Sequence, residues 1–323
     1  MQNLETLDNQ YTIVSKLDRD SSRVYYLAKH NQSQNYYLIE LLKDNNINAF
    51  PANEINVLNI LQNINNPNIL HYIENGNGPL ILKNKPPINK PYLKFEYASK
   101  YNLFKYISTR RFTERQGKLI FRKILNGVRA IHDAGICHRN INSFNILLDE
   151  NFNPKISGYS SACINANNLQ EFLNTSEYTA PEIFLHLPYN GIQYDIFSLG
   201  QLLFYIVTRQ LGFKSSQNND PFYSLIRQHN YGVYWNSDPF LQLNLSQSFK
   251  NLFVRMVDFN PNQRPTINQI LNDEWMQEIN NLNAEQLNAL EIEVKNEFQM
   301  RENQLHEFPP VKIDDHSDDD ELR

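Results

Sequence analysis

The N-terminal third of the chain carries short runs rich in β-branched and aromatic side chains, with polar stretches between them. The runs are YTIVSKL from Tyr11, RVYYLAKH from Arg23 and NYYLIELL from Asn35. Such side chains fit a pleated sheet, and polar turn-forming stretches end strands. The pattern predicts a strand-rich N-terminal part organised as a sheet.

From Leu103 the apolar residues change to helical spacing. The segment FTERQGKLIFRKILNGVRAIHDAG starts at Phe112, has apolar residues three and four positions apart, and carries Gly135 where a helix would stop. This predicts a long central helix. The two parts together predict an α+β fold.

A second helical pattern lies near the C-terminus. Asn283 followed by Gln286 has the form of a helix cap, and the helix is expected to run to about Leu305. Its apolar residues fall on one face: Leu287, Leu290, Val294 and Phe298. This stripe either packs on the preceding helices or serves as a face for a partner, and both outcomes are open.

Composition and charge narrow the class of protein. The 323 residues are 41% hydrophobic, and the net charge of −5 argues against a general nucleic-acid-binding surface. No apolar run approaches the ~20 residues that span a bilayer, and the polar start MQNLETLDNQ lacks an export segment. Cys137 and Cys163 form no spaced framework, and Cys137 is expected to be a small core residue. We expect a soluble, cytoplasmic protein.

Several short motifs stand in a recognisable order. The stretch ICHRNINSFNILLDENFNPKI starts at Ile136 and is followed by APE from Ala180, DIFSLG from Asp195 and NPNQRPT from Asn260. Upstream lie NEINVLNIL, NPNIL and YLKFEYA. The first stretch resembles the catalytic loop H-R-D-x-K-x-x-N with the hairpin that leads to D-F-G, and the others resemble further landmarks of the eukaryotic protein kinase superfamily.

The resemblance is to Ser/Thr kinases and implies a bilobal fold with a β-rich N-lobe and a helical C-lobe. It divides the chain into a leader (1–10), a kinase-like domain (11–279, with lobes 11–97 and 98–279), an amphipathic helix (280–307) and an acidic, disordered tail (308–323). The EWM motif is similar to the calcium/calmodulin-dependent group, but the acidic helix does not favour calmodulin. Ser317, before three aspartates, has a context that acidophilic kinases favour.

Four positions depart from the chemistry that the resemblance implies. Phosphoryl transfer needs the triphosphate held, Mg²⁺ placed and the attacking hydroxyl oriented. The chain has Glu40 for the phosphate-binding lysine, Asn140 for the catalytic aspartate, Asn142 for the loop lysine and Gly158 for the metal-binding aspartate. An amide has no useful basicity, and glycine has no side chain to bind a metal. We therefore expect no intact catalytic residue and no metal site.

The nucleotide loop is also altered. LDRDSSRVYYLA aligns with L-G-x-G-x-x-G-x-V-Y-x-A, so Asp18, Asp20 and Arg23 replace the glycines. The αC glutamate is kept as Glu54, and two carboxylates ~4 Å apart repel by about 4 kcal/mol at an effective dielectric near 20. The αC helix could swing outward, one carboxylate could hold a proton, or a cation such as Arg23 could enter. WNK kinases supply their lysine from a similar loop position.

The adenine pocket is expected to be narrowed. The resemblance puts Tyr25 and Leu38 above the adenine plane and Leu147 below it. Their bulk either occludes the base or is relieved by a shift of the strand. Asn145 persists and could offer one metal contact. ATP and magnesium binding is expected to be weak or absent, and no cofactor is expected.

Other matching positions are architectural. The resemblance implies two further sets of residues. One is a hydrophobic column that links the two lobes, and the other braces the C-lobe. The column has Leu58, Tyr72, His138 and Tyr159, and the bracing residues are Asp195, Glu182 and Arg264. Arg139 corresponds to an arginine that binds an activation-segment phosphate in related kinases, with Thr175 and Ser176 as candidate sites.

Three functions are compatible with these features. The main hypothesis is a pseudokinase, not an enzyme, that acts as a scaffold or allosteric module for an unknown protein partner, as a monomer or in a heteromeric complex. The first alternative is an atypical ATP-dependent Ser/Thr kinase with weak activity, in which Arg23 replaces the lysine and Asn145 holds one metal ion. The second alternative is a structural subunit of an intracellular, for example cytoskeletal, assembly.

Overall fold

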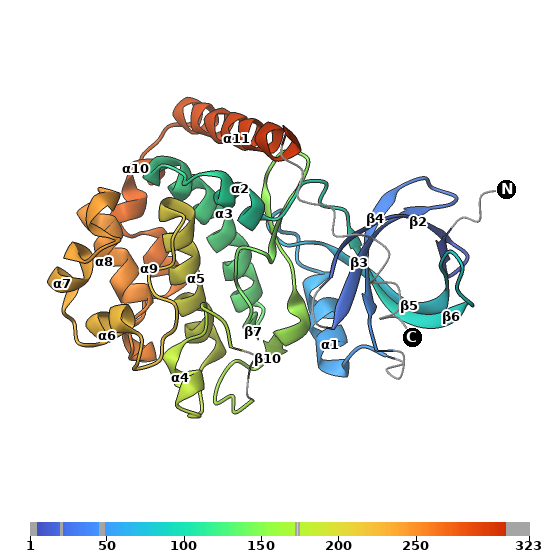
Figure 1. The fold of residues 1–323 in the computed structure, drawn as a ribbon, viewed down its shortest axis with the longest axis horizontal. Coiled ribbons are helices and arrows are strands. Elements are labelled where there is room, and N and C mark those ends of the chain that lie inside the picture. Colours follow the sequence, from blue (N-terminus) through green and yellow to red (C-terminus); the bar gives the residue numbers. More distant parts are fainter. Residues whose placement is uncertain (1–4, 20–21, 45–48, 172, 174, 308–323) are drawn as a thin grey trace. The chain divides into compact units, whose positions relative to one another are not determined.

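Strands and helices separate into two units in the computed structural model, which describes residues 5–19, 22–44, 49–171, 173 and 175–307 (Figure 1). The first unit comprises the described part of Met1–Asn65 together with Leu70–Ser99. The second comprises Asn66–Ile69 and the described part of Lys100–Phe308. The strand-rich first unit and the helical second unit confirm the α+β fold class.

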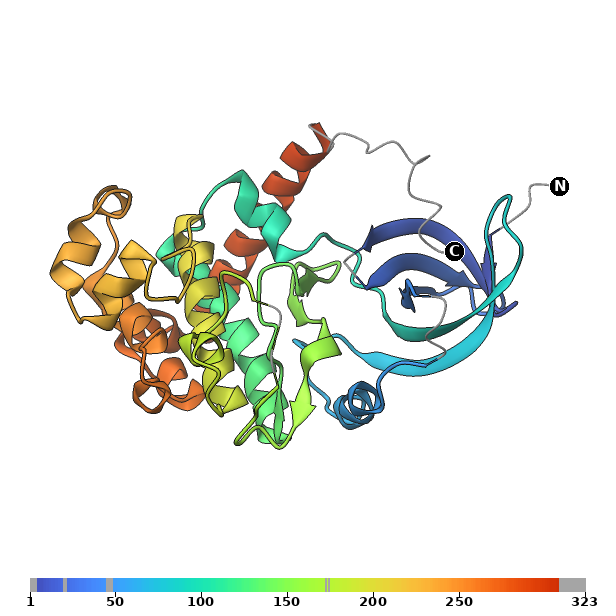
Figure 2. The same ribbon diagram turned by 60° about the horizontal axis from the view of Figure 1, so that its bottom comes forward.

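The first unit is a closed antiparallel barrel beside one helix, α1 (Ala52–Leu61) (Figure 2). The barrel order is β1-β2-β3-β4-β6-β5. The strands are β1 (Thr6–Leu7), β2 (Tyr11–Arg19), β3 (Arg23–His30), β4 (Tyr36–Leu42), β5 (Tyr72–Ile81) and β6 (Ile88–Glu96). The three runs predicted from the sequence are β2, β3 and β4. The barrel closes because β1, which lies in the segment expected to be a leader, pairs with both β2 and β5.

The second unit is built around two long helices, α3 (Glu114–Asp133) and α5 (Gly191–Thr208). Thr113 and Gln116 form a capping box that starts α3, and Gly135 follows its end with a φ of +74°, which glycine adopts without strain. The shorter helices surround this pair. They are α2 (Leu103–Thr109), α4 (Pro181–Phe184), α6 (Pro221–Arg227), α7 (Tyr231–Asn236), α8 (Gln247–Met256), α9 (Ile267–Leu271) and α10 (Gln277–Asn280).

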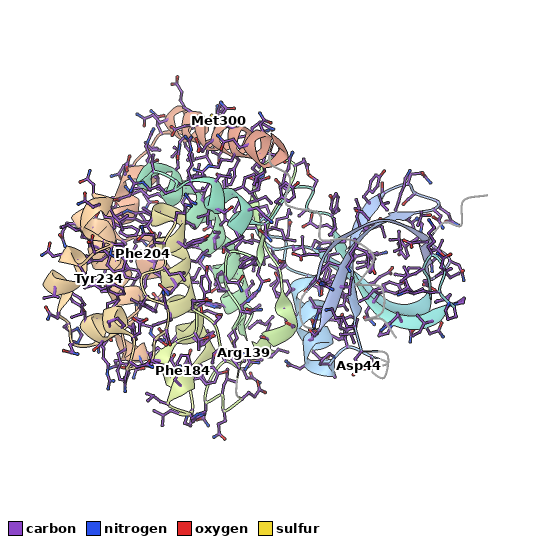
Figure 3. All side chains as sticks on the ribbon, viewed as in Figure 1. Asp44, Arg139, Phe184, Phe204, Tyr234 and Met300 are labelled. Carbon is purple, nitrogen blue, oxygen red and sulfur yellow. The ribbon has the colours of Figure 1, made fainter. Side chains whose placement is uncertain are left out.

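Two small antiparallel ladders carry the loops of this unit: β7 (Ile136–Cys137) with β10 (Cys163–Ile164), and β8 (Ile146–Leu148) with β9 (Pro154–Ile156). Its core is aromatic and includes Phe204 and Tyr234 (Figure 3). The ring of Phe204 lies 4.6 Å from that of Phe253, and the ring of Tyr234 lies 4.7 Å from that of Phe240. Rings at these separations gain stabilisation beyond the area that they bury.

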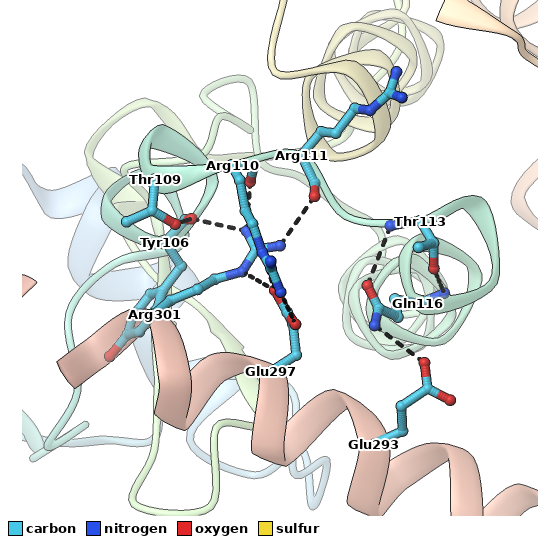
Figure 4. A network of polar contacts seen from close by, with 9 residues as sticks. All are labelled: Tyr106, Thr109, Arg110, Arg111, Thr113, Gln116, Glu293, Glu297 and Arg301. Atoms are coloured by element: carbon cyan, nitrogen blue, oxygen red, sulfur yellow. Dashed lines mark hydrogen bonds and ion pairs between the residues drawn. The ribbon is translucent and has the colours of Figure 1, made fainter. Parts of the chain in front are cut away.

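The predicted C-terminal helix is α11 (Ala284–Glu307), which lies against α2 and α3 (Figure 4). From the apolar stripe, Leu290, Val294 and Phe298 are buried. Arg301, only 1% exposed, pairs with Glu297 at 2.7 Å and donates to the carbonyls of Tyr106, Arg110 and Arg111. The stripe therefore packs within the chain, and Arg301 satisfies carbonyls at the end of α2.

Among the described residues, none of the helices combines the length and the apolar character that crossing a bilayer requires. The acidic tail, including Ser317, lies outside the described residues.

Candidate functional site

Arg23, the first residue of β3, lies between two buried carboxylates. Its Nη1 is 2.7 Å from Oε2 of Glu40 on β4, and its Nη2 is 2.7 Å from Oε2 of Glu54 on α1. Strand register explains the first contact: Tyr25 is directly opposite Glu40, so Arg23, two residues away, projects from the same face. Of the three outcomes that the sequence left open, the structure has the third, in which a cation separates the carboxylates.

The three side chains form a charged cluster shielded from solvent. Arg23 and Glu40 are each 5% exposed and Glu54 is 2% exposed. Burial by itself lowers the pKa of Arg23, but the charges of Glu40 and Glu54 outweigh burial and raise the pKa above its ordinary value. The guanidinium therefore stays charged. In these contacts one guanidinium lies between two carboxylate side chains.

Asp18, another of the nucleotide-loop positions, lies on an ordinary strand end. Asp18 is exposed near the end of β2, pairs with Tyr25 in the ladder, and accepts the backbone N–H of Arg19 at 2.8 Å. Asp20 lies outside the described residues. Leu38 is buried in β4, and Tyr25 is half-buried in β3. The occlusion of an adenine pocket stays a prediction.

The proposed column residues can be placed within their own units. In the first unit Leu58 on α1 and Tyr72 on β5 are buried, and the Tyr72 hydroxyl donates to Asn75 at 2.8 Å. In the second unit the rings of His138 and Tyr159 are 5.2 Å apart, and both residues are buried.

Asp195, fully buried on α5, fixes the backbone of the catalytic-loop segment. Its carboxylate accepts the N–H groups of His138 and Arg139, both at 2.7 Å, and its Oδ2 lies 2.8 Å from Nε2 of His132. Arg139 has a φ of +60°, an uncommon value for a residue with a side chain. The hydrogen bonds to Asp195 stabilise this conformation.

His138 is held as a neutral imidazole. Asn140 donates its N–H to Nδ1 at 3.2 Å, so Nδ1 is the acceptor and Nε2 donates to the carbonyl of Ser157 at 2.9 Å. Complete burial lowers the pKa of His138, more than the negative charge of Asp195 raises it. This residue is a packing and hydrogen-bonding element with no proton to supply near neutral pH.

The asparagines of this segment bind one another. Nδ2 of Asn142 donates to Oδ1 of Asn140 at 3.0 Å, and Nδ2 of Asn145 donates to the carbonyl of Asn140 at 2.8 Å. Oδ1 of Asn142 accepts the N–H groups of Phe144 and Asn145. Asn142 therefore acts as a loop-forming residue, as asparagine commonly does. Leu147 is half-buried in β8, opposite Asn102.

Position 158 leaves no room for a metal-binding side chain. Gly158 has a φ of +79°, and a Cβ added to it would stand 2.6 Å from Cγ and Oδ1 of Asn145. The Asn145 amide thus occupies the space that a metal-binding side chain at position 158 would need. Within the described ranges, no group of three His, Cys, Asp or Glu residues could hold a metal ion.

The Gly158→Asp variant is expected to be destabilised rather than to gain a metal site. The left-handed backbone costs a residue with a Cβ about 1–2 kcal/mol, and displacement of Asn145 costs a further ~1–3 kcal/mol. The measurement is the free energy of unfolding by urea. Gly135→Asp is the matched control, because Gly135 has a φ of +74° with nothing within 4 Å of an added Cβ. Equal losses in the two variants would contradict the steric argument.

Glu182 and Arg264 form a buried bidentate ion pair. Nη1 and Nη2 of Arg264 are each 2.7 Å from a carboxylate oxygen of Glu182. The guanidinium also donates to the carbonyls of Asp258 and Gln193 and lies over the ring of Phe197. Such geometry satisfies both charges and ties α4 to the segment after α8.

Sequence reasoning missed the carboxylate that Arg139 binds. Nη1 of Arg139 is 2.6 Å from Oε2 of Glu171 and 3.0 Å from the Tyr189 hydroxyl, and its Nε donates to the carbonyl of Ser161 at 2.6 Å. Burial lowers the pKa of Arg139, but the hydrogen bond to Glu171 and neighbouring charges raise it above its ordinary value. Arg139, which was expected to bind a phosphate, is thus already paired with a carboxylate. The sequence feature that could have revealed this pair is the acidic residue Glu171 in the activation segment.

Comparison with known proteins decides the family. The family model described as "Protein kinase domain" matches residues 11–276. The chain belongs to the protein kinase family.

Relatives of this kinase-family chain carry kinase names. It is 34% identical over 199 residues to NUAK family SNF1-like kinase 1 of Homo sapiens, covering 61% of this chain and 28% of the relative. It is 29% identical to CBL-interacting protein kinase 26 of Oryza sativa subsp. japonica (61% and 39% covered). It is 33% identical to "Probable serine/threonine-protein kinase MARK-B" of Dictyostelium discoideum (57% and 26%).

These relatives correct one prediction. The expectation that the chain is not an enzyme is wrong, because the relatives of this kinase-family chain are all named as kinases, one of them as a probable serine/threonine-protein kinase. The chain spans well under half of the length of each of these relatives, between 26% and 39%.

Proposed function

We propose that this chain is an atypical ATP-dependent serine/threonine protein kinase with weak activity. The observation that carries the proposal is the contact between Arg23 and Glu54 at 2.7 Å. In active kinases the strand lysine makes this pairing with the αC glutamate. Arg23 therefore stands as the cation that takes the place of the lysine lost at Glu40.

Each remaining group has a limited role in the proposed reaction. Arg23 binds phosphate oxygens of ATP, for which a guanidinium has suitable donors. The amide oxygen of Asn140 can accept a hydrogen bond from the acceptor hydroxyl but cannot take its proton. Loss of a general base commonly slows a reaction by about 10²–10⁴-fold, which leaves transfer slow but measurable because phosphoryl transfer depends mostly on positioning.

The charge of the phosphate-binding cluster also limits activity. Glu40, a carboxylate where the usual lysine would stand, opposes the approach of a polyanion. Magnesium would arrive with the nucleotide as part of the substrate, with Oδ1 of Asn145 available as one protein ligand. The domain boundaries and the remaining site assignments stay predictions.

Transfer of label from γ-labelled ATP tests the proposal. The purified chain should label itself or a mixture of serine- and threonine-containing proteins, slowly and in proportion to its concentration. Phosphoamino-acid analysis should give phosphoserine or phosphothreonine. Absence of labelling at millimolar ATP by a folded chain would contradict the proposal.

Glu171 leads to a prediction about control of this activity. Because a carboxylate already binds Arg139, phosphatase-treated protein should keep its rate. Glu171→Gln should lower the rate about two- to fivefold, the range expected for a partly exposed ion pair. The double variant Thr175→Ala/Ser176→Ala serves as the control and should match the unchanged chain. A rate lost in the double variant but kept in Glu171→Gln would show that a phosphate is needed.

A further inference from the structure

Two buried thiols face each other across the ladder of β7 and β10. Cys137 and Cys163 are directly opposite in the antiparallel register. Their sulfur atoms are 3.2 Å apart, and the residues are 0% and 5% exposed. The two cysteines are separated in sequence by 26 positions, and this spacing gave no sign in the sequence that they form a close pair.

The backbone at this place suits a disulfide. The N–H of Asn165 donates to the carbonyl of Gly135 at 3.2 Å, which makes those residues a hydrogen-bonded pair of the ladder. Cys137 and Cys163, two positions along, are again such a pair, for which Cα atoms are about 5.5 Å apart. Disulfides have Cα separations of about 4.4–6.8 Å and an S–S bond of about 2.05 Å. Closure therefore requires the sulfurs to approach by only roughly 1 Å.

The surroundings favour one sulfur as the nucleophile. The hydrogen bond with Cys137 lowers the pKa of Cys163, burial raises it, and the charge of Arg139 lowers it further, so that the pKa lies below its ordinary value. The same hydrogen bond raises the pKa of Cys137, as does burial. Cys163, whose pKa is lowered, lies in contact with a second cysteine, as in sites where one cysteine reacts and the other then forms the disulfide.

We propose that Cys137 and Cys163 form a reversible internal disulfide when the protein meets a peroxide. The Cys163 thiolate attacks one peroxide oxygen, so an S–O bond forms, the O–O bond breaks, and hydroxide leaves and takes a proton to become water. The Cys137 sulfur then displaces the sulfenic oxygen as its own proton leaves with that oxygen as water. Each sulfur gives up one electron, hydrogen peroxide takes up two, and the products are one disulfide and two waters.

The bond would join two functional segments. β7 leads directly into His138 and Arg139, and β10 starts the segment that carries Glu171. Sγ of Cys137 also lies against the first turn of α5, since a Cβ added to Gly191 would stand 2.3 Å from it. The ladder is thereby cross-linked at the base of the catalytic loop. The proposal is independent of phosphoryl transfer.

The test is mass spectrometry of the full chain after treatment with hydrogen peroxide and alkylation of free thiols. The unchanged chain should lose both alkylatable thiols and the mass of two hydrogen atoms, and dithiothreitol should restore them. A non-reduced digest should contain the linked peptides. The Cys137→Ser variant should instead accumulate oxygen adducts on Cys163. In the Cys163→Ser variant the remaining thiol, that of Cys137, should stay reduced and alkylatable.

Three results would overturn the proposal. The first is that both thiols of the folded chain remain alkylatable at a peroxide concentration that oxidises them when the chain is unfolded in urea. The second is addition of oxygen to either cysteine of the unchanged chain without a cross-link. The third is a disulfide between two copies of the chain, seen as a dimer on a non-reducing gel.

Discussion

Replacing Arg23 with methionine is expected to lower the free energy of unfolding by about 3–5 kcal/mol. Methionine keeps much of the side-chain volume but removes the charge, so Glu40 and Glu54 remain buried with no cation between them. Removing one side of a buried ion pair commonly costs ~3–5 kcal/mol, because the partner is left uncompensated. Urea denaturation followed by circular dichroism measures the change.

Two variants separate this effect from general damage to β3. Lys16→Met changes an exposed residue of β2 and should cost no more than ~0.5 kcal/mol. Arg23→Met/Glu40→Met removes one carboxylate together with the cation and should be more stable than the sum of its single changes predicts. If Arg23→Met costs no more than Lys16→Met, Arg23 does not hold the two carboxylates.

Restoring a carboxylate at the base position is expected to raise the rate of phosphoryl transfer by about 10²–10⁴-fold. Asn140→Asp is nearly isosteric, and an aspartate can still accept the hydrogen bond that Oδ1 of Asn140 receives from Asn142. General-base assistance is worth about 10²–10⁴-fold when the base is correctly placed. The initial rate of label transfer from ATP measures the change.

Asn262→Asp is the matched control for this gain. It introduces the same charge at an exposed site between α8 and α9 and should leave the rate unchanged. A gain in both variants would point to bulk charge. No gain in Asn140→Asp would mean that the residue is not positioned to assist the acceptor hydroxyl.

Patterns of neighbouring residues in the sequence predicted the strands and the helix that have a regular repeat of their own. The three N-terminal runs are β2, β3 and β4, and the helical repeat from Phe112 is α3. Closure of the barrel was not predicted, because a two-residue strand such as β1 has no periodicity and is recognised only by its pairing with β5. The fate of the C-terminal stripe also required tertiary contacts, which place Phe298 against Phe112.

The candidate site likewise has features that the sequence predicts and features that depend on tertiary contacts. The sequence identified Glu40, Glu54 and Arg23 but left three outcomes open, because the position of a long side chain depends on strand register and on the docking of α1. The contacts of Arg139 with Glu171 and of Cys137 with Cys163 join residues separated by 32 and 26 positions. No motif links such residues, and only the folded chain brings them together.

Arg23 is proposed to supply the phosphate-binding cation, beside a carboxylate, Glu40, that stands in the place of the usual lysine. The rate of phosphoryl transfer at low ATP concentration, compared between Glu40→Gln and Arg23→Met, tests it most directly. Two unit charges ~10 Å apart interact by about 1.7 kcal/mol at an effective dielectric near 20, and removing a carboxylate charge near the phosphates should have an effect of at least this order. Glu40→Gln should therefore be faster on the order of tenfold, and folded Arg23→Met should be slower by at least that factor. Rates equal to that of the unchanged chain in both variants, or a slower Glu40→Gln, would contradict the claim.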